Sequence, residues 1–275
     1  MNQRLHAFIY EDKYSGLILA VGLLLLLTIW YASFGIFSMH TTVGFDSRLQ
    51  LVGQVLLLIL LPSYLAAALI FAQRRSLQLA QQIQSVAVFN FAHYIELVPR
   101  RTLLIGCLVG GFFSLLNLPG DPGSIIRSNS SVVYVIAVGQ ILLWVFVGFL
   151  LAIRFHVART FYKAGKRVKL DIFEPSGLKP FGQEGLTDAL LVVGALTITV
   201  VQSIDAQFRL GNYMNAFLVT LPATTVLMVM PMYSLHRRIV DCKNEELRQI
   251  NASILAAPKD LAGNHVDQLE SLLQR

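Results

Sequence analysis

Three glutamines with side chains that can form hydrogen bonds lie in otherwise apolar stretches of this chain: Gln54, Gln140 and Gln202. A side-chain amide both donates and accepts hydrogen bonds. In a membrane such groups either bond to neighbouring helices or line a polar path for a solute. Both interpretations stay open at this point. The other polar side chains at comparable depth are Ser63, Thr199 and Thr220.

Motifs of enzymes are missing from the sequence. It contains no G-x-S-x-G, H-E-x-x-H or C-x-x-C sequence and no Walker loop. We therefore expect no catalytic residue, no cofactor, no metal site and no enzymatic activity. The six histidines show no metal-ligand spacing, and they are His6, His40, His93, His156, His236 and His265.

No charged residue is expected near the middle of an apolar stretch, where proton-coupled pumps place one. The deepest acid is Asp188, which lies about one turn inside the stretch 186–204. An acid in the first turn of a helix is favoured by the helix dipole. We interpret Asp188 in this way.

The segment 154–185 is strongly basic and lies between two apolar stretches. Short loops rich in Lys and Arg face the cytoplasm, so this segment sets the orientation of the chain. Basic residues near a membrane surface also attract anionic lipid headgroups. The residues predicted to make such lipid contacts are Lys163, Lys166, Arg167 and Lys169.

The end of the basic segment has the pattern D-I-F-x-P-x-x-L-x-P-F, from Asp171 to Phe181. Its prolines fix the backbone and Gly177 permits a tight turn. Its apolar residues are unusual for a solvated linker. We predict an ordered loop that couples the membrane part to a cytoplasmic helix; a rigid connector without a partner is the alternative. The predicted coupling residues are Asp171, Phe173, Pro175, Pro180 and Phe181.

This loop, together with Gly185-Leu186, resembles a group of uncharacterised bacterial inner-membrane proteins. The stretch from Leu221-Pro222 to Arg237-Arg238 is similar to the last span and exit of the same group. The resemblance covers about residues 165–250. It implies a multi-pass protein of the bacterial inner membrane and supplies no activity.

Composition predicts an all-α integral membrane protein. The chain has 275 residues, of which 55% are hydrophobic and 14% charged, whereas soluble domains carry about 25% charged residues. An apolar helix of about 20 residues crosses a bilayer. Six spans of a helix bundle are expected, at about 16–38, 51–72, 102–118, 132–153, 186–204 and 215–235.

The distribution of charge orients these spans. The loops 39–50, 119–131 and 205–214 each hold one Asp and one Arg, so the net charge of +6 lies in the other segments. Both termini are therefore expected in the cytoplasm. This asymmetry explains the basic balance without nucleic acid. The predicted parts are a membrane domain, 1–238, and a cytoplasmic helical tail, 239–275.

Two further helices are expected outside the spans. Apolar residues at helical spacing predict a helix on the membrane surface over 76–98. The last span is expected to continue as a helix to about residue 257. Gly106 and Gly110 form a G-x-x-x-G sequence, which favours close helix contact within the chain or in a homo-oligomer.

A short sequence similarity within the chain suggests an internal repeat. V-G-Q-V-L-L, which starts at Val52, recurs as V-G-Q-I-L-L at Val138. The expected spans that begin at about residues 16, 102 and 186 are also almost evenly spaced, which fits three related hairpins. Alternating loop lengths in a chain of six spans produce the same even spacing.

Two functional hypotheses follow. The first is a non-enzymatic membrane module, an anchor or sensor that relays a state to cytoplasmic helices. The second is a channel or small-solute transporter with a path lined by glutamines. A shared cavity at the three glutamines would favour transport, whereas glutamines buried singly would favour the module.

Overall fold

The computed structural model describes most of the chain, and every element within the described residues is helical. Apolar runs without interior breakers, apart from three prolines, account for the length of these helices. The described residues are 14–38, 47–84, 95, 98–118, 122–127, 130–166, 178–204, 210–256 and 273–274. The elements are α2 (Ser15–Ser33), η1 (Ile36–Ser38), α3 (Arg48–Gln84), α5 (Arg100–Leu116), α6 (Pro122–Arg127), α7 (Ser131–Gly165), α8 (Lys179–Thr199), η3 (Val200–Ser203) and α9 (Leu210–Ala256).

Five of these helical segments are long and apolar enough to cross a membrane: α2, α3, α7, α8 with η3, and α9. They match five of the six expected spans, as in a multi-pass membrane protein. The expected third span corresponds to α5, which has 17 residues. At 1.5 Å per residue it is about 25 Å long, slightly shorter than the hydrocarbon core of a bilayer. The sixth crossing therefore remains a prediction.

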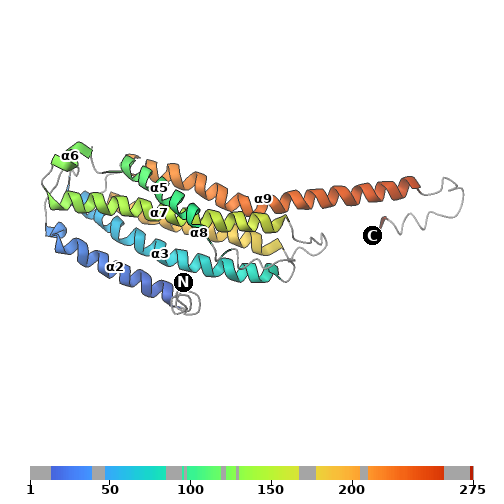
Figure 1. The fold of residues 1–275 in the computed structure, drawn as a ribbon, viewed down its shortest axis with the longest axis horizontal. Helices are drawn as coiled ribbons and strands as arrows, with labels where there is room; N and C mark the ends of the chain where they lie inside the picture. Colours follow the sequence, from blue (N-terminus) through green and yellow to red (C-terminus); the bar gives the residue numbers. More distant parts are fainter. Residues whose placement is uncertain are drawn as a thin grey trace.

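The helices lie roughly side by side in an elongated bundle (Figure 1). Within each of three hairpins the partners pack on each other: α2 on α3, α5 on α7, and α8 on α9. The main core forms where α2, α3, α7 and α8 meet. It contains Tyr31, Leu58, Ile136 and Leu191, all buried. Many other large apolar residues of these helices are exposed, which suits contact with lipid.

Glycines allow α5 to approach α7 closely. A Cβ added at Gly106 would lie 2.5 Å from the carbonyl oxygen of Gly148. A Cβ at Gly110 would collide with the backbone of Trp144 and Val145. The predicted G-x-x-x-G contact therefore exists within the chain, and Gly148 supplies its second side.

The predicted surface helix over 76–98 is not a separate element where the structure describes it. α3 runs without interruption from Arg48 to Gln84, through Pro62. Leu79, Ala80 and Ile83 are buried against other helices, so burial in the bundle replaces the expected contact with the membrane surface. Residues 85–94 lie outside the described part.

These α3 residues belong to a second cluster, here called the collar, at the end of the bundle that holds the ends of α3 and α7 and the start of α8. Phe161 and Phe181 meet edge to face in it, with ring centroids 6.0 Å apart. Leu235 of α9 also packs there. Its buried residues are Leu79, Ala80, Ile83, Ile95, Val157, Phe161, Ala164, Phe181 and Leu235.

α9 is the longest described helix, and about half of it projects beyond the bundle (Figure 1). It has 47 residues, equivalent to about 70 Å. As expected, the helix continues from the last span into the polar tail. From Arg237 to Ile254 nearly all side chains are exposed. The predicted end of the tail, 257–272, lies outside the described residues.

Candidate functional site

A buried cluster of charged residues lies where α3, α7 and α8 meet, and we call it the charged cluster. Arg154 of α7 donates from Nε to Asp188 Oδ1 at 2.6 Å and from Nη2 to Glu184 Oε1 at 2.5 Å. All three side chains are 0–1% exposed. Ion pairs removed from solvent to this degree need good hydrogen-bond geometry to offset the cost of desolvation.

Ser76 completes the cluster from α3. Its hydroxyl lies 2.8 Å from Glu184 Oε1 and accepts hydrogen bonds from Arg154 Nη1 and Nη2 at 3.1 and 3.2 Å. The same hydroxyl lies 2.8 Å from the carbonyl oxygen of Ala72 in its own helix. One serine therefore connects the backbone of α3 to the charges on α7 and α8.

Helical geometry brings the acids together. Glu184 and Asp188 are four residues apart in α8, so they lie on one face of the helix, one turn from each other. Gly185, between them, packs against the backbone of Met228 in α9. α8 is thus held between α9 on one side and the charges of α7 on the other.

The charged cluster corrects two of our interpretations. Asp188 is the partner of a buried arginine, not simply an acid favoured by a helix N-terminus. Arg154, which opens the basic segment 154–185, lies buried inside the bundle and not in an exposed loop. The sequence did contain a signal: Arg154 extends the apolar stretch of α7, and the acids show i, i+4 spacing. Neither pattern reveals that the two elements meet.

The three predicted glutamines form a hydrogen-bonded chain. Gln54 Nε2 donates to Gln140 Oε1 at 2.8 Å, and Gln202 Nε2 donates to Gln54 Oε1 at 2.9 Å. Gln202 lies in η3, where the end of α8 tightens into a 3₁₀ helix. The chain therefore joins α3, α7 and η3. Gln202 Oε1 is buried and accepts no hydrogen bond from the described residues.

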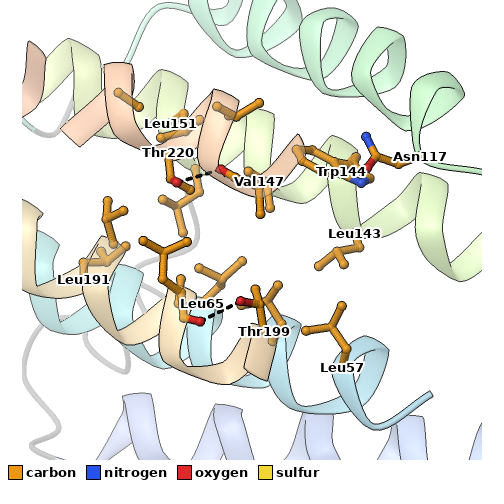
Figure 2. A pocket seen from close by; sticks show the side chains of 18 of the residues that line it. Leu57, Leu65, Asn117, Leu143, Trp144, Val147, Leu151, Leu191, Thr199 and Thr220 are labelled. Carbon is orange, nitrogen blue, oxygen red and sulfur yellow. Dashed lines mark hydrogen bonds between the residues drawn. The ribbon is translucent and has the colours of Figure 1, made fainter. Parts of the chain in front are cut away.

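A cavity of about 100 Å³ lies between α3, α7, α8 and α9, and Gln140 and Gln202 line it. Its wall is mainly apolar. Figure 2 shows Leu57, Leu65, Leu143 and Thr199 around the space, with Trp144 at one end. The indole Nε1 of Trp144 has no hydrogen-bond acceptor among the described residues. The cavity thus has a mainly apolar wall, and two of its lining residues, Trp144 and Gln202, each hold one buried polar atom without a partner among the described residues.

The predicted coupling loop is described only at its end. Pro180 lies in the first turn of α8, and Phe181 is fully buried in the collar. Asp171, Phe173 and Pro175 lie outside the described residues.

Of the four residues predicted to contact lipid, the structure likewise describes only some. Lys163 and Lys166 are exposed at the end of α7, and Lys166 Nζ lies 4.5 Å from the centroid of the Tyr162 ring. Arg167 and Lys169 fall outside the described part.

Comparison of the chain with protein-family models, with curated proteins and with solved structures gives no match. Within the described residues, His, Cys, Asp and Glu do not gather in groups of three or more that could hold a metal ion. The features from which a function can be inferred are therefore the charged cluster, the glutamine chain, the cavity and α9.

Proposed function

We propose that this chain is a non-enzymatic multi-pass membrane module that relays the state of its helix bundle to the cytoplasm through α9. One observation carries the proposal. A single continuous helix forms part of the cavity wall inside the bundle and then projects beyond it (Figure 1). α9 stays helical through Pro222 and Pro231, so a tilt of its inner half changes the position of the projecting half, which a flexible linker would not do.

The contacts of α9 suit such a relay. Ala216, Thr220 and Ala223 line the cavity. Farther along, Leu235 packs in the collar, and a Cβ added at Gly165 of α7 would collide with Ser234. The bundle therefore holds α9 at two levels. Any change at the cavity reaches the projecting half through the collar, which acts as a pivot.

The projecting half offers a surface for an output. Leu247, Ile250 and Ile254 are exposed and recur at helical spacing. They form a narrow apolar stripe on the projecting half of α9, which is otherwise mostly polar. A cytoplasmic helix of complementary pattern is the kind of partner that this stripe would contact.

Electron paramagnetic resonance distance measurements test the relay. Spin labels at Gln81→Cys in α3 and Ser253→Cys in α9 report the position of the projecting half, with Cys107 and Cys242 replaced by alanine. Ala223→Phe fills part of the cavity at the wall that α9 forms. The helix from Leu235, at the pivot in the collar, to the distant label is about 27 Å long, so a tilt of about 5° would move that label by about 2 Å.

The matched control is Leu221→Phe, which enlarges an exposed side chain on the same turn of α9. We expect Ala223→Phe to shift the distance distribution and Leu221→Phe to leave it unchanged. If both variants keep the distribution of the parent protein, the bundle does not control the projecting half and the relay is wrong.

A channel or small-solute transporter is the second candidate, and the glutamine chain favours it. The glutamines are not buried singly; they bond to one another, and two of them line one cavity. The mainly apolar wall limits the candidate solutes to small uncharged molecules. Stopped-flow measurements of glycerol and urea entry into proteoliposomes test it. Permeation above that of empty liposomes that Gln54→Leu abolishes would support transport, and equal permeation would exclude it for these solutes.

A further inference from the structure

The charged cluster has an unbalanced charge. One guanidinium faces two carboxylates, so the cluster carries a net charge of −1 if both acids are ionised. An uncompensated charge that is 0–1% exposed costs several kcal/mol in a protein interior, and such groups usually neutralise instead. A further positive charge at this position would remove the cost.

Neighbouring helices do not supply that charge within the described residues. On α3, Arg75 donates to Gln183 Oε1 at 3.2 Å and Arg74 donates to Ser15 Oγ at 2.6 Å. α9 packs against α8, but it contains no charged residue from Leu210 to Leu235. On α7, Arg159 and Lys163 are exposed and His156 is half-buried, so the fully buried cation of that helix is Arg154.

The second oxygen of each acid is the place where the compensating ligand would bind. Glu184 Oε2 and Asp188 Oδ2 are buried, and neither accepts a hydrogen bond from the described residues. The first oxygens are bonded to Arg154, with Ser76 also on Glu184. Buried polar atoms are nearly always satisfied in folded proteins, so two unpartnered oxygens in one cluster point to a cation bound in it.

We propose that the charged cluster is a proton-binding site that holds a single proton on the pair Glu184 and Asp188 at neutral pH. The proton comes from the solvent and forms an O–H bond on one of the two free carboxylate oxygens. The cluster is then neutral, with one carboxylate paired to Arg154 and one carboxylic acid. Release of the proton would leave a net charge of −1 between α7 and α8. Proton binding does not depend on the relay proposed above.

Infrared spectroscopy at pH 7 tests the site, on protein purified in a detergent without ester groups. Exposed acids are ionised at this pH, so a carboxylic acid C=O band reports a buried protonated group. We expect one such band in the parent protein. Labelling the side-chain carboxyls with ¹³C, first in glutamate and then in aspartate, shows which acid holds the proton without changing the sequence.

Substitutions give a stricter outcome. Glu184→Gln and Asp188→Asn each leave one carboxylate opposite Arg154, so the cluster is neutral without a proton and the band should vanish in both. Glu246→Gln, on the exposed part of α9, should keep the band. The proposal is overturned if the unsubstituted protein shows no carboxylic acid C=O band at pH 7, or if neither the glutamate label nor the aspartate label shifts that band. It is overturned equally if the band persists in both cluster variants.

Discussion

Ser76 shows how a single hydroxyl can decide whether a buried charge is tolerated. It links α3 to the charged cluster, and it accepts hydrogen bonds from two nitrogens of Arg154. Without it, Arg154 Nη1 would have no acceptor in this network. An unsatisfied buried donor on a charged group costs more than a neutral hydrogen bond contributes.

Replacing Ser76 by alanine should therefore destabilise the protein by about 1–3 kcal/mol. Ser253→Ala is the matched control, because Ser253 makes the same kind of bond to the carbonyl oxygen four residues earlier but lies exposed on α9. Thermal unfolding in detergent, followed by circular dichroism, compares the two. Equal melting temperatures for both variants would show that the hydroxyl does not support Arg154.

At this scale the sequence predicted some residues and not others. The glutamines were predictable because amides in apolar stretches must find partners. The charged cluster was not predictable. The basic segment 154–185 was enough to explain Arg154, and the dipole of the following helix was enough to explain Asp188. Their association depends on the rotation of α7 against α8, and the periodicity of either helix alone does not define it.

Among the elements, the α5–α7 pair is the most constrained. Gly106 and Gly148 face each other, and Gly110 lies against the backbone of Trp144 and Val145. Such close approach provides van der Waals contact, which largely drives helix association where lipid removes the hydrophobic effect. It also makes the pair intolerant of added atoms.

Two neighbouring glycines of α5 test this constraint. Gly110→Ala should cost about 1–3 kcal/mol, because its new methyl group overlaps the backbone of α7. Gly111→Ala adds the same methyl group where the nearest atom, a Val145 Cγ, is 3.9 Å away, and it should be neutral or slightly stabilising. Both are measured by thermal unfolding. A larger loss for Gly111→Ala than for Gly110→Ala would contradict the close packing of α5 on α7.

Element boundaries were predicted well where composition changes sharply and poorly where it does not. The expected continuation of the last span to about residue 257 is confirmed by α9, which ends at Ala256. The expected span at 132–153 lies within α7, but that helix continues beyond the apolar stretch to Gly165. The residues over 76–84 have the pattern of a surface helix, yet they continue α3, because Leu79 and Ile83 find apolar partners in the collar. Amphipathic spacing does not distinguish lipid from a neighbouring helix as the apolar environment.

In the whole molecule, the polar features lie at different levels along the helix bundle. The glutamine chain lies near the end of the bundle where α3 begins, and the charged cluster lies near the collar, where α8 begins. The cavity reaches from Gln202 to Leu191 along α8. α9 borders this cavity and then projects past the collar, which gives the bundle a preferred direction for an output.

The proposed relay depends most on α9 passing from the membrane bundle into the cytoplasm. Single cysteines at Ser47, before α3, and at Ser253, on the projecting half of α9, test it in a background without Cys107 and Cys242. A membrane-impermeant thiol reagent applied to intact cells should label Ser47→Cys and should label Ser253→Cys only after the membrane is permeabilised. Labelling of Ser253→Cys in sealed cells, with Ser47→Cys protected, would place α9 on the outer side and contradict the relay to the cytoplasm.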